Sequence, residues 1–234
     1  MRTRKLSPQL YQLDFEIGNA YLWRDTGSLT LIDTGTAGSG ELIARSIEHL
    51  GWSTGDLDRV VLTHAHEDHA GAAAEIGAWG GVTVIAHRLD VPVVRGESVA
   101  ARPAFQGAPE WERTLFETKP PLPPAPPAQV NQVLDEGDVL DFGGGAHVIS
   151  VPGHTDGSIA LYVPKTGVLF TGDALANPDG QTMVGVFNTD RDRAIASLHR
   201  LADLDVDTAC FGHGDPVVGS ASAALRGAAA SCDG

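Results

Sequence analysis

The chain has 234 residues, of which 42% are hydrophobic, and its formal net charge is −14. This length supports one sizeable core, so we expect a single domain over residues 1–234. The acidic charge argues against a nucleic-acid partner, because phosphates and carboxylates repel each other. The sequence contains no apolar run of membrane-spanning length, and its two cysteines do not form a disulfide framework. We therefore expect a cytoplasmic protein without a nucleic-acid or membrane partner.

The first third of the chain reads as strands followed by alternating helices and strands. Turn pairs such as Gly18-Asn19 separate short apolar runs, which is typical of antiparallel strands. Apolar residues with helical spacing then end at Gly51. The expected strands are 10–17, 20–24, 28–33, 59–62 and 82–86, and the expected helices are 38–51 and 70–78.

Residues 91–130 break this pattern and contain the proline-rich tract 120–127. Long irregular stretches inside a domain are commonly lids or binding loops, so we interpret 91–130 as a Pro-rich insert that forms a lid or pocket wall. Its apolar side chains either line a substrate pocket or form a small core of their own. They are Phe105, Trp111, Leu115 and Phe116.

The second half repeats the order of strands, helix and strand. Strands are predicted at 132–134, 139–142, 147–151, 158–163, 168–171 and 208–211, and helices at 190–204 and 220–230. We expect the first five of these strands to form a second antiparallel sheet. The weak internal repeat favours two facing sheets with helices outside.

One loop carries three imidazoles and two carboxylates within six positions. It is His64-Ala65-His66-Glu67-Asp68-His69, directly after the strand at 59–62. Neutral imidazole and carboxylate are the usual ligands of zinc and similar divalent ions. The pattern predicts a metal-binding loop.

Three further polar residues each follow a predicted strand. His154, Asp173 and His213 stand in loops of similar design, Pro152-Gly153-His154, Thr171-Gly172-Asp173 and Phe211-Gly212-His213. Each alone is typical of a turn or cap residue. Together with the loop at His64 they indicate one shared site.

At this point the sequence resembles the metallo-β-lactamase superfamily, whose ordered motifs match Asp33 in Leu31-Ile32-Asp33-Thr34-Gly35, the loop from His64 to His69, and the three later residues. The resemblance implies an α/β fold, an αββα sandwich of two mixed, largely antiparallel sheets with helices on the outer faces. It also implies two divalent metal ions, with Asp173 bridging them and Asp33 supporting a ligand from behind. One ion would be held by His64, His66 and His154, and the other by Asp68, His69 and His213. The absence of a thiolate favours zinc, with iron or manganese as alternatives.

Departures from particular members narrow the expected substrate. The bridging Asp173 argues against β-lactam hydrolysis, since the genuine β-lactamases of the family generally lack it. Only 21 residues follow His213, which leaves no room for the helical region with which glyoxalase II enzymes bind glutathione thioesters. A large inserted domain or basic exosite, as in nucleic-acid-processing members, is also missing. Flavodiiron proteins carry an acidic residue at one of the loop histidine positions, whereas this chain keeps His64 and His66.

These observations favour a metallo-hydrolase that uses a metal-bridging hydroxide to cleave an ester, lactone or thioester of a small molecule. Asp68 is the expected catalytic residue, because it can orient the nucleophile or move its proton. One alternative is an oxidoreductase similar to persulfide dioxygenases, which bind a single iron at positions matching His64, His154 and Asp173. Another is a non-catalytic metal-binding module.

Overall fold

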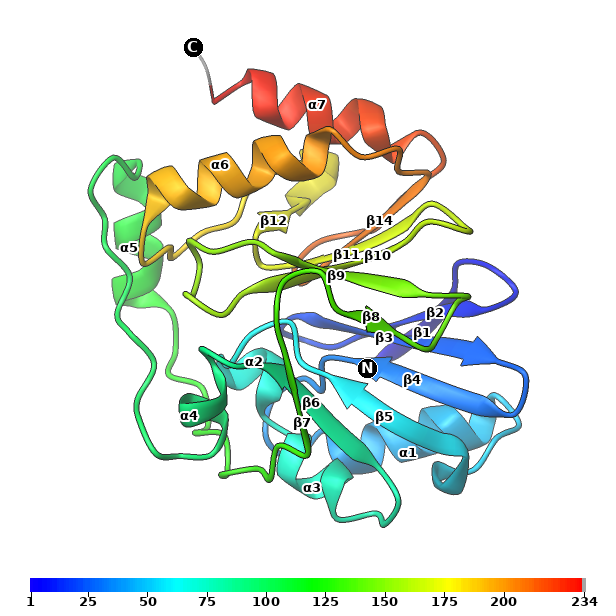
Figure 1. The fold of residues 1–234 in the computed structure, drawn as a ribbon. Coiled ribbons are helices and arrows are strands. Elements are labelled where there is room, and N and C mark those ends of the chain that lie inside the picture. The colour runs from blue at the N-terminus through cyan, green and yellow to red at the C-terminus, as the bar shows by residue number, and fades with distance from the viewer. Residues whose placement is uncertain (233–234) are drawn as a thin grey trace.

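The first half of the chain forms a seven-stranded sheet in the order β1-β2-β3-β4-β5-β6-β7, seen in a computed structural model that describes residues 1–232 (Figure 1). The strands from β1 to β4 pair antiparallel, whereas β4 to β7 pair parallel. Their bounds are β1 Arg2–Lys5, β2 Leu10–Asp14, β3 Asn19–Asp25, β4 Ser28–Ile32, β5 Leu57–Val61, β6 Thr83–His87 and β7 Gln132–Leu134.

The second sheet has six strands in the order β15-β14-β11-β10-β9-β8. All of its neighbours pair antiparallel except β11 and β14, which are parallel. The bounds are β8 Val139–Leu140, β9 Ala146–Ser150, β10 Ile159–Val163, β11 Val168–Gly172, β14 Thr208–Phe211 and β15 Val217–Val218. A separate two-stranded sheet joins β12 Leu175–Ala176 to β13 Met183–Val184.

Helices cover the outer face of each sheet, so that the molecule has four layers (Figure 1). The helices are α1 Gly40–His49, α2 Glu67–Ala70, α3 Ala73–Gly77, α4 Val91–Val94, α5 Glu110–Thr118, α6 Arg191–Ala202 and α7 Ala221–Ala230, with 3₁₀ turns η1 Thr54–Asp56 and η2 Pro178–Gly180. Within residues 1–232, none of the helices is long and apolar enough to cross a membrane.

Three apolar clusters hold these layers together. The first packs Ile43 and Ile47 of α1 against the first sheet, and the last packs Leu198 of α6 and Leu225 of α7 against the second. The middle cluster lies between the sheets and is rich in aromatic rings, with Trp23 contacting both Phe142 and Phe170. Buried rings of this kind contribute much of the apolar area that drives two sheets together. This layering confirms the expected αββα sandwich.

One expectation for a strand was wrong, and the N-terminal strand was not predicted. Residues 132–134 do not open the second sheet; they form β7, which pairs parallel with β6 in the first sheet. The chain crosses from β6 to β7 through the insert, a connection that local sequence does not reveal. Residues 2–5, for which no element was predicted, form the edge strand β1 on β2. An edge strand is held by backbone hydrogen bonds, so its basic sequence gives little signal.

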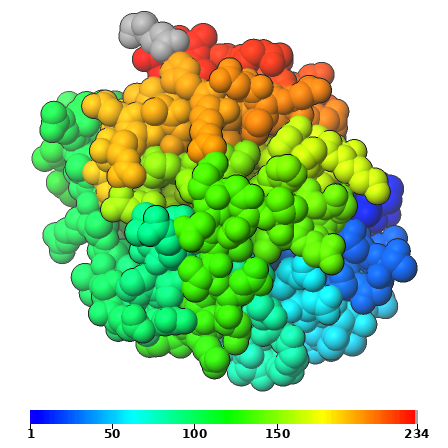
Figure 2. All heavy atoms as spheres, in the orientation of Figure 1, coloured from blue at the N-terminus to red at the C-terminus, as the bar shows by residue number. Residues whose placement is uncertain are grey.

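The insert at 91–130 contains two helices, α4 and α5, joined by irregular chain. In Figure 2 its green spheres cover one flank of the molecule, beside the orange spheres at the start of α6. The backbone N–H of Ala104 donates to the carbonyl of Asn188 at 2.8 Å, which ties the insert to the segment before α6. The insert is therefore packed on the body of the molecule.

Candidate metal centre

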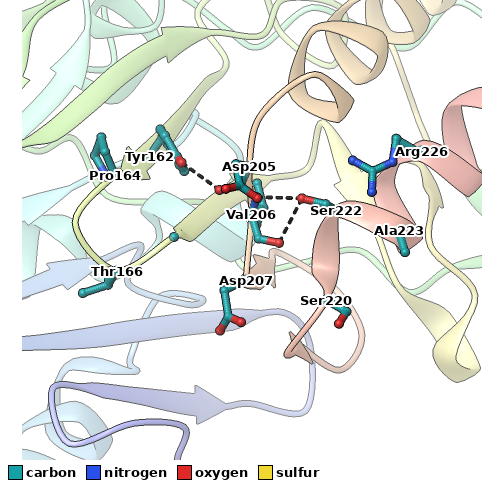
Figure 3. A pocket seen from close by; sticks show the side chains of 11 residues that line it. Tyr162, Pro164, Thr166, Asp205, Val206, Asp207, Ser220, Ser222, Ala223 and Arg226 are labelled. Atoms are coloured by element: carbon teal, nitrogen blue, oxygen red, sulfur yellow. Dashed lines mark hydrogen bonds between the residues drawn. The ribbon is translucent and has the colours of Figure 1, made fainter.

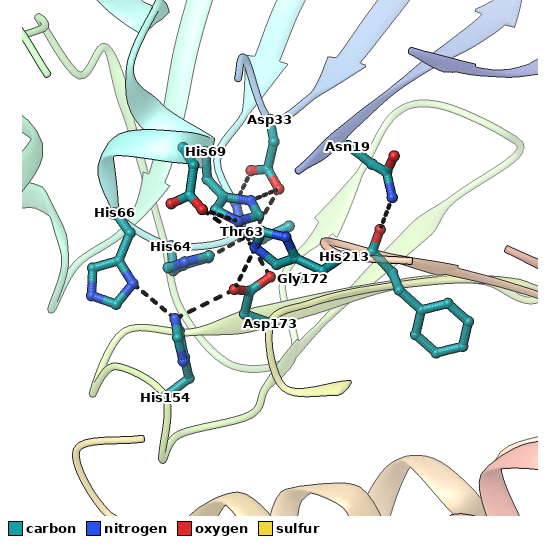
Figure 4. A network of polar contacts seen from close by, with 12 residues as sticks. Asn19, Asp33, Thr63, His64, His66, His69, His154, Gly172, Asp173 and His213 are labelled. Carbon is teal, nitrogen blue, oxygen red and sulfur yellow. Dashed lines mark hydrogen bonds and ion pairs between the residues drawn. The ribbon is translucent and has the colours of Figure 1, made fainter. Parts of the chain in front are cut away.

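Two pairs of parallel strands bring five polar residues to one edge of the sandwich (Figure 4). Asp33 follows β4 and Thr63-His64 follows its parallel neighbour β5, while Asp173 follows β11 and His213 comes after its parallel neighbour β14. The carboxyl ends of parallel strands lie at the same edge of a sheet. The backbone N–H of Ile159 donates to the carbonyl of Thr63 at 2.9 Å, which joins the two sheets at this edge.

The loop after β5 turns directly into the single-turn helix α2. His64 is buried in the loop, and His66 is the residue that precedes the helix. Asp68 and His69 lie on the turn itself, where the backbone N–H of His69 bonds the carbonyl of His66 at 3.0 Å. This tight turn directs the polar side chains of one short segment toward the same point.

The structure brings all seven expected metal-site residues together. In each of three groups, one nitrogen or oxygen atom per residue lies within 4.8 Å of the others. The groups overlap, and His64 and His69 each belong to two of them. They are His64 with His66 and His154, Asp68 with His69 and His213, and His64 with His69 and Asp173.

Asp33 lies behind this cluster and belongs to none of the three groups. Its carboxylate accepts hydrogen bonds from the backbone N–H and the hydroxyl of Thr63, at 2.7 and 2.8 Å. It also lies 2.9 Å from Nδ1 of His69. A carboxylate on one ring nitrogen fixes the orientation of the imidazole and directs the other nitrogen, Nε2, into the cluster.

His154 is oriented by a backbone carbonyl. Its Nδ1 donates to the carbonyl oxygen of Val186 at 3.0 Å. With the proton on Nδ1, the lone pair on Nε2 faces the cluster, where it lies 2.8 Å from Nδ1 of His66. Two ring nitrogens this close fit a shared cation well, because each can donate a lone pair to it.

Burial keeps one half of the cluster neutral. Desolvation lowers the pKa of His66, lowers that of His64 far below its usual range, and lowers that of His154 to about 3. An imidazole must be neutral to bind a metal ion. These three side chains are therefore in the form that coordination requires.

The other half of the cluster combines carboxylates with charged imidazoles. The charge of Asp173 raises the pKa of His213 to about 10. Burial alone would lower the pKa of His69, but Asp173, Asp68 and Asp33 outweigh it and raise this pKa well above its usual range. Burial likewise opposes ionisation of Asp173, yet His213 and His69 lower its pKa. The carboxylates of this half of the cluster thus favour positive charge beside them.

Several buried polar atoms of the cluster have no hydrogen-bond partner, as expected if they bind a cation. Among residues 1–232, the buried side-chain atoms without a hydrogen-bond partner are His64 Nε2, His69 Nε2, Asp173 Oδ1 and Asn188 Oδ1. The first three belong to the cluster. His69 Nε2 and Asp173 Oδ1 lie 3.2 Å apart as an ion pair, but neither forms a hydrogen bond. Leaving a buried polar atom without a hydrogen bond costs about 1–3 kcal/mol, and three such atoms in one place indicate a missing common partner. The arrangement and donor types fit divalent metal ions.

Sequence reasoning missed Asp90, a buried aspartate that ties two loops of the cluster together. Its carboxylate accepts from the backbone N–H of Ala65 at 2.8 Å, from the hydroxyl of Thr155 at 2.9 Å and from the N–H of Gly157 at 3.0 Å. These residues flank His64 and His154. In the sequence Asp90 stands just before α4, where an aspartate is normally interpreted as a helix cap; its side chain caps nothing here.

A surface depression of about 600 Å³ lies at the other end of the second sheet (Figure 3). It is lined by Gly167, which precedes β11, and by Asp207, which precedes β14, whereas the cluster follows both strands. Two of its hydroxyl groups are paired internally: that of Tyr162 donates to the carbonyl of Asp205 at 2.7 Å, and that of Ser222 bonds Val206. Nothing connects this depression to the metal centre.

Comparison with known proteins agrees with the fold and the cluster. The chain is 29% identical over 231 residues to the probable metallo-hydrolase YflN of Bacillus subtilis, covering 90% of this chain and 85% of the relative. It is 32% identical over 192 residues to a hydroxyacylglutathione hydrolase of Ruegeria pomeroyi, covering 81% of this chain but 58% of that relative. A crystal structure of a metallo-beta-lactamase family protein from Thermus thermophilus superposes with a TM-score of 0.70 at 26% identity, covering 97% of this chain and 79% of the other.

The sequence profile of the metallo-beta-lactamase superfamily matches residues 13–213, which include every residue of the cluster. The relatives named as hydrolases and the His/Asp cluster together support a hydrolase that uses divalent metal ions. On this evidence the chain belongs to the metallo-beta-lactamase superfamily.

Proposed function

We propose that the chain is a dinuclear metallo-hydrolase that cleaves an ester, lactone or thioester of a small molecule in the cytoplasm. The observation that carries this proposal is the overlap of three His/Asp groups, with unpaired buried atoms of His64, His69 and Asp173 facing one another. Two ions there, for which we favour zinc with iron or manganese as alternatives, would activate a water molecule and polarise the substrate carbonyl.

The positions of the side chains suggest how the cluster divides between two ions. His64, His66 and His154 would hold one, and Asp68, His69 and His213 the other. Asp173 stands between them: its Oδ1 lies 3.2 Å from Nε2 of His69, and its Oδ2 lies 3.2 Å from Nε2 of His213 and 3.7 Å from Nε2 of His154. A carboxylate whose two oxygens face different groups can bridge two cations.

Asp68 is the proposed catalytic residue. Its side chain is 15% exposed, against 9% for Asp173, and its Oδ2 lies 3.3 Å from Nε2 of His213. A carboxylate at the border of the cluster can orient an attacking water and receive its proton, provided that it lies within hydrogen-bond reach of the nucleophile.

Carbonyl substrates are supported by two observations. Relatives at 30–32% identity are named hydroxyacylglutathione hydrolases, which is the name of a thioester hydrolase. The acidic chain also offers little positive charge to neutralise a phosphodiester, whose cleavage needs cationic groups beside the phosphate.

The proposal is tested by measuring metal content and then hydrolysis of a panel of esters, lactones and thioesters. We expect two ions per chain and activity on at least one substrate class. His66→Ala should lose the activity, while His49→Ala, which alters an exposed histidine at the end of α1, should keep it.

Fewer than two ions per chain would overturn the dinuclear proposal, as would activity that survives in His66→Ala. A single iron ion with oxygen uptake on glutathione persulfide would point to the dioxygenase-like reaction instead. Two bound ions without hydrolysis of any substrate in the panel would favour a non-catalytic metal-binding module.

A further inference from the structure

The helix α5 of the insert buries a charged residue. Glu112 is 2% exposed and is the buried residue of that helix, whereas the apolar Trp111 and Leu115 are 49% and 45% exposed. A buried carboxylate is costly unless it is paired and hydrogen-bonded. Contacts of Glu112 with the rest of the molecule must therefore compensate.

The two oxygens of Glu112 bond the segment between β13 and α6 and the first residue of α6. Oε2 accepts from Nη1 of Arg191 at 3.1 Å, and Oε1 accepts from the backbone N–H of Phe187 at 2.6 Å. That N–H belongs to the same peptide group as the carbonyl of Val186, which accepts from Nδ1 of His154 at 3.0 Å. One peptide group thus links the carboxylate of Glu112 to the imidazole of His154.

This arrangement has two physical effects on His154. Hydrogen bonds in series polarise one another, so a carboxylate on the N–H makes the Val186 carbonyl a stronger acceptor. The carbonyl in turn holds the proton on Nδ1 of His154 and directs Nε2 into the cluster. Partners of this kind set both the orientation and the basicity of an imidazole that binds a metal.

The peptide group is held against its local preference. Phe187 has a φ of 62°, a left-handed conformation that is uncommon for a bulky residue and costs about 1–3 kcal/mol. An unsupported chain would relax toward another conformation and rotate the Val186 carbonyl away from His154. The bonds from Glu112 and the packing of Phe187 on Phe116, at 5.2 Å between ring centroids, oppose this relaxation.

We propose that Glu112 is a positioning residue for the metal centre, acting through the Val186–Phe187 peptide group on His154. The insert is then part of the scaffold of the ion held by His64, His66 and His154, and not only a wall beside it. This inference rests on the proposed two-ion site.

The test is a titration of metal-free protein with Zn²⁺ in competition with a chromogenic chelator, which resolves the affinities of the two ions. For Glu112→Ala we expect one affinity to fall about tenfold, the lower end of the effect of losing a partner of a coordinating histidine, with the other unchanged. Glu117→Ala, on the exposed side of the same helix, is the matched control and should bind like the unmodified chain.

Two milder variants separate positioning from folding. Glu112→Asp keeps the charge but draws the carboxylate back by one methylene, so it should show the same selective loss even if Glu112→Ala does not fold. Glu112→Gln keeps an oxygen acceptor for the N–H of Phe187 and should restore the affinity to within about threefold, because the peptide group stays paired. The absorption spectrum of the Co²⁺-loaded protein should change in the aspartate variant and not in the glutamine variant.

A folded Glu112→Ala or Glu112→Asp chain with both affinities unchanged would overturn the inference, and so would an equal loss for both ions. A lowered unfolding temperature with normal affinities would assign Glu112 to simple anchoring of the insert. Failure of the proposed function is a different result: the unmodified chain would then bind fewer than two ions.

Discussion

Gly212 shows how little space surrounds the carboxylate of Asp173. A Cβ at this residue would lie 1.9 Å from Oδ1 of Asp173 and 2.8 Å from Cε1 of His69. Gly212→Ala should therefore displace the Asp173 carboxylate and weaken metal binding by about tenfold or more, as losses of precise ligand orientation do. Titration with Zn²⁺ measures this effect.

Gly227 provides the contrasting substitution. It lies in α7, and a Cβ there would have no atom within 4 Å. Gly227→Ala should leave metal affinity unchanged and raise the free energy of unfolding by about 1 kcal/mol, the difference in helix propensity. Similar metal affinities in the two alanine variants would contradict the crowding at Gly212.

Asp90 carries a separate prediction. Its three hydrogen bonds need two acceptor oxygens, and asparagine offers one oxygen and one N–H₂ group. Asp90→Asn should lower the free energy of unfolding of the metal-free chain by about 1–3 kcal/mol, the cost of leaving buried partners unpaired. Urea denaturation checks this value.

The control for that experiment is Asp58→Asn, which alters an exposed aspartate whose nearest cation is 3.9 Å away. This control should change the stability by a few tenths of a kcal/mol at most, as surface ion pairs usually do. An equal effect of the two variants would show that the bonds of Asp90 contribute nothing specific.

The sequence allowed every member of the cluster to be predicted, but not the residues that hold the cluster in place. Histidine and aspartate in a dense loop have a recognisable spacing, and strand ends such as the one before His213 are visible as apolar runs. Glu112 and Asp90 have no such signal, because their roles depend on contacts with Phe187 and Ala65, which lie 75 and 25 positions away. Only the tertiary structure relates them to the site.

At the scale of elements, the insert was predicted as irregular, and its apolar side chains were left with two interpretations. In the structure, some of these side chains are packed and others are exposed. Phe105 and Phe116 pack together at 5.5 Å and share a cluster with Phe187 from outside the insert, whereas Trp111 and Leu115 are exposed. A helical period in 110–118 was hidden by the prolines on both sides of it.

This packing predicts how firmly the insert is held. Phe116→Ala removes contacts with two rings, each worth about 0.5–1.5 kcal/mol beyond buried area. Local opening of the insert should become roughly tenfold more frequent, since about 1.4 kcal/mol corresponds to a factor of ten. Limited proteolysis under native conditions should cut within 97–130 correspondingly faster.

Leu115→Ala serves as the control for that measurement. Its side chain lies on the same helix and is 45% exposed, so its removal should leave the cleavage rate nearly unchanged. Equal rates for the two variants would mean that the aromatic cluster does not anchor the insert.

At the scale of the whole molecule, metal binding should stabilise the fold. The candidate ligands come from both sheets, so ions that bind the folded chain but not the unfolded chain shift the folding equilibrium. At free metal 100-fold above the dissociation constant, the gain is about 2.7 kcal/mol per site. Removal of metal with a chelator should lower the unfolding temperature by roughly 5–10 °C for each site that is emptied, at 2–4 °C per kcal/mol for a chain of this size.

Differential scanning fluorimetry before and after chelation, and again after Zn²⁺ is restored, measures this shift. In His64→Ala, a residue shared by two of the three groups, the difference between the two states should shrink strongly. A chelator-independent unfolding temperature in the unmodified chain would show that no ion is linked to folding.

The parallel pairing of β11 with β14 also determines when the candidate ligands come together during folding. His64, His66, Asp68 and His69 leave the ribosome long before Asp173 and His213. Asp173 follows β11, and His213 reaches the edge of the sandwich only when β14 has inserted beside β11. During synthesis, the loop after β5 is therefore exposed before Asp173 and His213 are in place. Only part of the candidate ligand set is then present. The full set of candidate ligands is assembled only after the second sheet has formed. A chain with a fully occupied site is therefore one that has finished folding.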